Sequence, residues 1–157
     1  MPVPVVLADG TLVVAIEDNG LVPGAKLQPA VVSGEDGGER WGALAEPLPA
    51  EVYAGAPYLR QLPTGETILS CQSDAGVAGV AGEPRRRRPE MVVYVGDAAA
   101  RGFSGPTSPF ELPSDVAGQW NALFVKDATT VTALSGTRID GKRGVWAIDG
   151  KVVRARK

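Results

Sequence analysis

The chain contains no histidine and only one cysteine, and these absences remove several kinds of chemistry. Without histidine, Ser-His-Asp and Cys-His catalysis are unavailable, and no metal site can use imidazole ligands. The single thiol, Cys71, allows no internal disulfide and no cysteine-ligated zinc cluster. It lies in the predicted strand ILSCQS, where a buried and unreactive thiol is expected. The sequence therefore predicts no metal and no cofactor.

Long apolar runs and an excess of charge of one sign are also missing. No apolar run approaches the roughly 20 residues of a membrane span, and the start, MPVPVVLADG, does not have the features of a signal peptide. Sixteen basic and eighteen acidic side chains leave a net charge of −2, which attracts neither nucleic acid nor an anionic membrane. The basic run Arg85–Arg88 has no interleaved aromatic residues, which favours a solvated loop over a phosphate-binding site.

What the chain does have is turns and a repeated pattern. Its 157 residues, the length of one domain, include 20 glycines and 13 prolines, which predict many turns and few long helices. One pattern, an apolar run, a short polar turn and a second apolar or β-branched run, occurs three times. The three stretches are Val3–Glu17, Tyr58–Gln72 and Asn121–Ser135. When they are overlaid, Leu7, Leu62 and Val125 coincide.

A repeat of this length, with further strand-like runs behind each hairpin, is typical of a β-propeller blade. The sequence therefore predicts an all-β fold: a partial β-propeller of about three four-stranded antiparallel blades in a single domain, 1–157. Blade one is expected over 2–47, blade two over 56–110 and blade three over 119–157. Three blades are too few to close a ring. We therefore expect the missing blades to come from the same parent protein or from a second copy of the chain.

Turn residues predict where the hairpins reverse. Asp9-Gly10 and Pro63-Thr64-Gly65 are expected to close the first hairpins of blades one and two. Blade three is expected to pair strands at 120–126 and 130–136 and to form its outer pair within 143–153. The outer pair is predicted to turn at Asp149-Gly150, because an Asp-Gly pair readily adopts the positive φ of a tight hairpin.

Candidate functional residues gather where the inner strands of the predicted blades end. The overlaid repeats place Glu17, Gln72 and Ser135 at equivalent positions, with Asp18 next to Glu17. An acid that ends an apolar strand either faces solvent or points into the central channel as an acid, base or nucleophile.

Aromatic residues and an arginine lie in the segment EVYAGAPYLRQL, which holds Tyr53, Tyr58 and Arg60. A guanidinium suits a carboxylate or vicinal hydroxyls, and tyrosines suit the faces of sugars. The alternative is that Tyr58 is a packed strand residue and Arg60 a charge at the edge of a blade. Trp120 and Asn121 open blade three in the same region.

Five segments together resemble the C-terminal half of the sialidase-like (BNR-type) propeller glycoside hydrolases, which include exo-sialidase homologues and exo-arabinanases. They are AIEDNG, PLPAEVYAGAPYLRQLPTGETILSCQS, MVVYVGDAAARGFS, LPSDVAGQWNALFVKD and GVWAIDGKV. The resemblance implies a five- or six-bladed propeller that removes terminal sugars from glycans at the centre of one face. It implies that Glu17 is a catalytic glutamate and that Arg60 is a substrate-binding arginine. Together with the residues singled out above, the predicted substrate-binding set is Asp18, Tyr53, Tyr58, Arg60, Gln72, Trp120 and Asn121.

The sequence also departs from that family. It contains no S-x-D-x-G-x-T-W motif, and Ala56 stands where sialidases carry a tyrosine. The second catalytic carboxylate would lie in the missing blades, so this chain alone is expected to be an inactive part of an exo-acting glycoside hydrolase. The alternatives are a non-catalytic glycan-binding propeller and a half-propeller that closes by homodimerisation. Glycan substrates imply that the parent protein is secreted or periplasmic.

Overall fold

The fold consists of antiparallel β-sheets. The structure, a computed structural model, describes residues 2–18, 28–35, 38–43, 55–73, 89–113 and 115–153; for 18, 28–33 and 35 it describes the backbone alone. The described strands form two sheets of four strands and one of three.

The strands follow one another in the sheets nearly as they do in the chain. The first sheet contains β1 (Val3–Val6), β2 (Leu12–Asp18), β3 (Gln28–Glu35) and β4 (Arg40–Trp41), in that order. The second contains β5 (Gly55–Gln61), β6 (Thr67–Ser73), β7 (Glu90–Gly96) and β8 (Ser104–Thr107). The third contains β9 (Gln119–Val125), β10 (Thr130–Ile139) and β11 (Lys142–Lys151). Every neighbouring pair is antiparallel.

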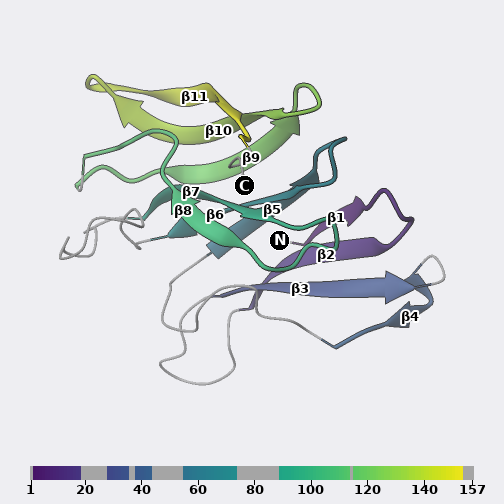
Figure 1. The fold of residues 1–157 in the computed structure, drawn as a ribbon. Helices are drawn as coiled ribbons and strands as arrows, with labels where there is room; N and C mark the ends of the chain where they lie inside the picture. The colour runs from purple at the N-terminus through teal and green to yellow at the C-terminus, as the bar shows by residue number, and fades with distance from the viewer. Residues whose placement is uncertain are drawn as a thin grey trace.

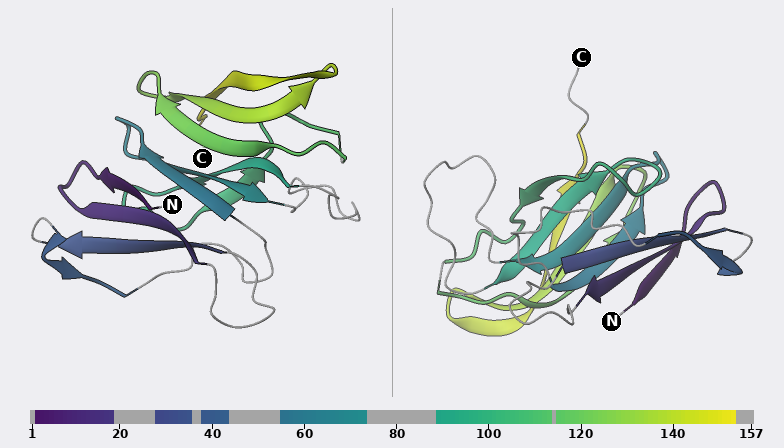
Figure 2. Two further views of the ribbon diagram at one scale, coloured as in Figure 1. Left: turned by 180° about the vertical axis from the view of Figure 1, so that it is seen from behind. Right: turned by 90° about the horizontal axis from the view of Figure 1, so that it is seen from below.

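The three sheets are stacked face to face with their first strands adjacent. β1, β5 and β9 are each an edge strand of their sheet, and β5 contacts both β1 and β9. Figure 1 shows the third sheet above the second and the first sheet below it, and the view from behind in Figure 2 shows the same order. This is the arrangement of successive blades around one side of an axis, and the predicted all-β, antiparallel architecture is confirmed.

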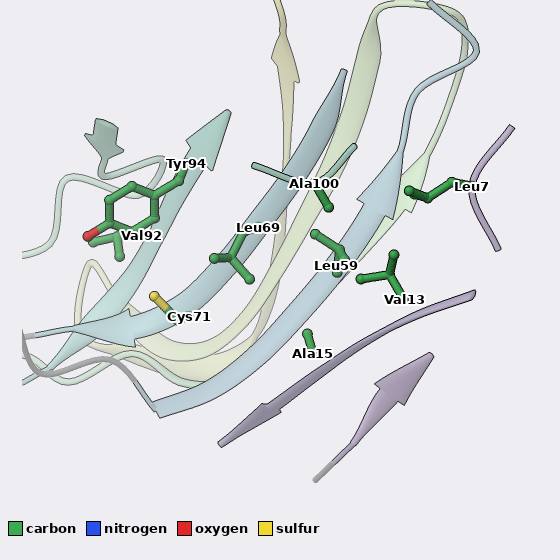
Figure 3. Packing of buried hydrophobic residues seen from close by; sticks show 9 residues of the cluster. All are labelled: Leu7, Val13, Ala15, Leu59, Leu69, Cys71, Val92, Tyr94 and Ala100. Carbon is green, nitrogen blue, oxygen red and sulfur yellow. The ribbon is translucent and has the colours of Figure 1, made fainter. Parts of the chain in front are cut away.

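The second sheet is buried on both faces. Figure 3 shows Val13 and Ala15 of β2 facing Leu59 of β5, and Leu69 and Cys71 of β6 belong to the same cluster. On its other face, a second cluster joins residues of the second sheet to residues of the third: Leu62, Ile68, Met91, Leu123, Val131 and Ala133. Strict alternation of side chains along β5, β6 and β7 supplies both clusters.

The third repeat is displaced by one position from the predicted overlay. In the first two turns, the N–H groups of Leu7 and Leu62 donate to the carbonyls of Thr11 and Glu66, each at 2.8 Å. In the third turn the equivalent donor is Lys126, which bonds to Thr130 at 2.9 Å. The predicted counterpart of Leu7 and Leu62, Val125, is 38% exposed, whereas those two leucines are buried. A shift of one position exchanges the faces of a strand, so it changes which residues are equivalent.

The predicted hairpin at Asp149-Gly150 is wrong. β11 runs straight through these residues, which pair with Thr132 and Val131 of β10. Asp149 is held in the extended strand because its carboxylate accepts a hydrogen bond from Thr132 Oγ1 at 2.7 Å and pairs with Lys126. The outer pair of strands expected within 143–153 is thus a single strand, and the third sheet has three strands among the described residues.

The turn before β11 lies instead at Asp140-Gly141. Both residues have positive φ, 49° and 77°, and they connect Ile139 to its register partner Lys142. Positive φ at both central positions is the requirement of a type I′ hairpin turn.

Replacement of Gly141 by alanine is expected to destabilise the fold by about 1 kcal/mol, because a Cβ disfavours its φ of 77°. Gly150 lies in an extended strand and has no atom within 4 Å of the position that a Cβ would take, so Gly150→Ala is the matched control and should change stability little. Urea unfolding of the two variants measures the difference. Equal losses would contradict the assignment of the turn.

The Cys71 thiol is expected to be unreactive in the folded chain. It is completely buried, and this burial raises its pKa to about 12. The thiol therefore stays protonated between neutral pH and pH ~9, where an ordinary cysteine ionises. Labelling with a disulfide reagent should be slow and nearly independent of pH over that interval in native protein, and fast in urea. Rapid labelling of the native chain would show that the interface between the first two sheets opens.

Candidate functional site

Glu17 joins the first sheet to the second. It lies near the end of β2, and its Oε2 accepts a hydrogen bond of 2.6 Å from the backbone N–H of Ala56 in β5. Ala56 sits in a bulge of β5 with a φ of 47°, which turns its N–H away from the regular ladder. The predicted catalytic carboxylate is therefore engaged with the next sheet.

Gln72, at the equivalent position of β6, makes a similar connection to the third sheet. Its Nε2 donates to the carbonyl of Gly118, just before β9, at 3.3 Å. The backbone approaches closely there, because a Cβ at position 118 would lie 3.1 Å from both Met91 N and Ser135 Oγ, a tight contact that favours glycine. The side chains at this one strand position thus form hydrogen bonds across two consecutive sheet junctions.

In the third sheet this position is Gly136, which has no side chain to make such a bond. Because Lys126 is the counterpart of Leu62 in the turn, Gly136 rather than the predicted Ser135 is the counterpart of Gln72. Ser135 is buried and directs its hydroxyl to the carbonyl of Gln119 at 3.5 Å. In front of Gly136 lies an open cavity of about 630 Å³.

The cavity has an aromatic wall and charged walls. The indole of Trp120 is 76% exposed, and Trp120 has a φ of 53° at the bulge of β9. Arg138 of β10 and Arg143 of β11 are paired across the ladder and also line the cavity. Asp115 and Gln119 add an acid and an amide. The site combines a flat apolar surface with donors and acceptors of both charges.

Sequence reasoning found Trp120 but missed Arg138, Arg143 and Asp115. A signal was present, because the two arginines flank Asp140-Gly141 symmetrically. Had the turn been assigned to this Asp-Gly pair, the two arginines would have been expected on facing strands.

Tyr58 and Arg60 form a pair on β5. Arg60 Nη2 donates to the Tyr58 hydroxyl at 2.8 Å, and its guanidinium carbon lies 4.4 Å from the centre of the Tyr58 ring. Arg60 Nη1 also donates to the carbonyl of Leu59 at 2.8 Å. Tyr58 packs against the cluster between the second and third sheets, so this pair belongs to that junction.

The junction of the second and third sheets also contains Asn121, whose Oδ1 accepts a hydrogen bond of 3.2 Å from Ser70. Ser70 is the register partner of Tyr58. The structure thus brings together Tyr58, Arg60, Gln72 and Asn121, whereas Glu17 lies in the preceding junction. Tyr53 and the run Arg85–Arg88 lie outside the described residues, as does the side chain of Asp18.

Glu90 is a buried acid that the sequence analysis did not single out. It begins β7, is 2% exposed and pairs with Ser73 of β6. Alternation places its side chain on the same face as Val92 and Tyr94, which pack toward the first sheet. Glu17 and Glu90 therefore face the same junction. The signal in the sequence was an acid directly before an apolar strand, MVVYVG.

Neither a metal cluster nor a membrane-spanning helix occurs within the described ranges. No group of three or more acidic or cysteine side chains there is arranged to hold a metal ion. Nor does that part of the chain contain a helix long and apolar enough to cross a membrane.

Comparison with known proteins relates the fold to sugar-associated propellers. The sequence matches no protein-family profile and no curated protein. Among solved structures, an α-L-arabinanase from Penicillium chrysogenum, determined with arabinobiose, is similar with a TM-score of 0.66 at 13% identity, over 96% of this chain and 46% of its own. A Hadza microbial sialidase is similar with a TM-score of 0.63 at 16% identity, over 96% of this chain and 34% of its own.

A fucose lectin from Kordia zhangzhouensis, determined with methyl-fucoside, is similar with a TM-score of 0.50 at 13% identity, over 96% of this chain and 94% of its own. This chain thus spans about half of the arabinanase, a third of the sialidase and nearly all of the lectin. At these identities the likeness establishes the fold. The predicted partial β-propeller and its resemblance to the sialidase-like propellers are confirmed at that level.

Removal of the Glu17 carboxylate is expected to weaken the junction of the first two sheets. Glu17→Ala should lower the free energy of unfolding by about 1–2 kcal/mol, because a part-buried, charge-assisted hydrogen bond is lost. Glu17→Gln keeps an oxygen acceptor and should lose less than half as much. Glu39→Ala, at an exposed turn, serves as control in urea unfolding. Full stability of Glu17→Ala would contradict this role.

Proposed function

We propose that this chain is a carbohydrate-binding β-propeller element that takes a terminal sugar in the cavity beside Trp120. The observation that supports this most directly is the exposed indole at a concave site that also carries two arginines and a carboxylate. Ligand sites characteristically combine an apolar surface with a few convergent polar groups.

The lining groups match the chemistry of a sugar. The C–H face of a pyranose or furanose ring stacks on an aromatic ring, and the Trp120 indole presents such a ring. Arg138 and Arg143 donate hydrogen bonds in a planar fork to vicinal hydroxyls or to a carboxylate, and Asp115 accepts from hydroxyls. The three similar structures agree with this theme, since two were determined with arabinobiose and methyl-fucoside and the third is a sialidase.

Hydrolysis of terminal sugars by an exo-acting enzyme is the second candidate. It is favoured by two acids, Glu17 and Glu90, that face one junction, and by the similarity to an arabinanase and a sialidase. Most glycosidases use two carboxylates on either side of the scissile bond. Glu17 is already bonded to Ala56, so turnover would need further sheets of a complete propeller to supply the substrate position. In this chain alone we propose binding without turnover.

We also propose that the parent protein is secreted or periplasmic, since glycans that carry terminal arabinose, fucose or sialic acid are substrates outside the cytoplasm. The remaining predicted site residues keep a proposed role in the same recognition. Tyr58, Arg60, Gln72 and Asn121 would shape the junction next to the cavity, through the bonds that they make to one another, to β9 and to the segment before it.

Replacement of Trp120 by alanine is expected to weaken sugar binding at least about tenfold, because the stacking surface is lost. The wild-type chain is first screened on a glycan array that includes terminal arabinose, fucose and sialic acid, and the best ligand is titrated by calorimetry. Trp41→Ala removes the other strongly exposed tryptophan, on the first sheet, and should leave affinity unchanged. Equal affinity of Trp120→Ala and wild type would contradict the proposed site.

Aryl α-L-arabinofuranoside and aryl sialoside test the second candidate with the same proteins. We expect no release of the aryl group by this chain. Release that disappears in Glu17→Gln would replace the binding proposal by the hydrolase, whereas release that persists in that variant would remove Glu17 from any catalytic role.

A further inference from the structure

The first sheet has an outer face, turned away from the second sheet, that is apolar. Val13 and Ala15 of β2 point toward the second sheet, so alternation places Val14 and Ile16 on the outer face. Their neighbours on that face are Pro4, the register partner of Val14, and Val6, which is 66% exposed. We define the outer face of the first sheet as Pro4, Val6, Val14 and Ile16.

The third sheet has an outer face that is apolar in part and carries charged groups beside its apolar residues. Leu123, Val131 and Ala133 point toward the second sheet, which leaves the alternate residues facing outward. Phe124 is 52% exposed and Val145 is 76% exposed. We define the outer face of the third sheet by these two residues together with Ala122, Leu134, Gly136 and Ala147, which alternate with the buried set. The same face also carries Thr132, Asp149 with its partner Lys126, and the pair Arg138 and Arg143.

These two faces are the repeat counterparts of the two faces that are already buried in the second sheet. The overlay that matches Leu62 with Leu7 places Leu59, Leu69 and Cys71, which pack against the first sheet, onto Pro4, Val14 and Ile16. The overlay that matches Leu62 with Lys126 places Tyr58, Arg60 and Ser70, which face the third sheet, onto Ala122, Phe124 and Leu134. It also places Ile68 and its partner Val95 onto Thr132 and its partner Asp149, so one end of this face is polar and pairs its charge with Lys126. The outer face of the first sheet thus corresponds to the face of the second sheet that packs against the preceding sheet. The outer face of the third sheet corresponds to the face of the second sheet that packs against the following sheet.

We propose that the outer face of the third sheet packs on the outer face of the first sheet of a second copy, and that the reciprocal contact closes a ring of six sheets. Two such contacts are related by a two-fold axis along the propeller axis, so the head-to-tail pairing closes after two copies. The contact continues the two junctions inside the chain, because it uses the same strand positions on both sides. The apolar residues that are exposed in one chain are buried by it.

The second copy also completes the sugar cavity; this part rests on the proposed function. Gly136 and Val145, which line the cavity, lie on the outer face of the third sheet, so the contact gives the cavity its missing wall. In the two junctions inside the chain, Glu17 and Gln72 occupy the position equivalent to Gly136 and form hydrogen bonds across the junction. At the junction between copies, Gly136 has no side chain to form such a bond, so the cavity stays open. The ring would carry two such sites.

The mass of the 157-residue chain in solution tests the pairing without any sugar, so its outcome is independent of the proposed binding function. Light scattering after size exclusion should give twice the 16.3 kDa of one chain. Phe124→Glu on the third sheet and Val6→Glu on the first sheet should each raise the dissociation constant at least about tenfold, because a charge must be buried. Thr107→Glu, on the exposed edge of the second sheet, is the matched control and should leave the mass unchanged.

The two variants distinguish this ring from other assemblies. Both substituted side chains are exposed in the single chain, so each variant should fold, which circular dichroism checks. Mixing the two variants should restore pairs, because one of the two junctions is then free of substitutions. Loss of pairing in one variant only would indicate a contact between identical faces and overturn the proposal. A wild-type chain that remains single at every concentration, as expected when the free faces receive further sheets of a longer polypeptide, would overturn it as well.

Discussion

The burial of both faces of the second sheet is the constraint on which the structure depends. A single β-sheet has two faces, and strands that are apolar on both of them are stable only between two neighbours. β5, β6 and β7 alternate residues for the first sheet with residues for the third, and both sets are buried. This requirement stacks the sheets, brings the first strands together and determines which end of each strand meets the next sheet.

One equivalent position in the second strand of each sheet has a different role in each of the three sheets. Glu17 and Gln72 both reach the start of the next first strand, one as an acceptor and the other as a donor. Gly136 occupies the same position in the third sheet and leaves a cavity instead. A repeated fold keeps the backbone positions constant, so a single side chain decides whether a junction is fastened or open to a ligand.

The site residues differ in how well the sequence predicts them. Trp120 was predicted because a tryptophan and an asparagine open the third repeat, and it forms the exposed wall of the cavity. Arg138 and Arg143 were missed because they are brought together only by the pairing of β10 with β11. The two Asp-Gly pairs of the third repeat are alike locally, and the partners of Asp149 keep the second pair extended.

The sequence alone determined the class of fold, because alternation and turn residues are local properties. The turns at Gly10 and Gly65, with φ of 90° and 102°, and the hairpins around them could be read directly. The third turn contains no glycine, so its register was predicted one position out, and only the backbone bond from Lys126 to Thr130 establishes it. Tertiary structure alone decided that Glu17 binds the next sheet, that Glu90 is buried and that two sheet faces are left free. These properties depend on contacts between residues far apart in the chain, which local patterns do not encode.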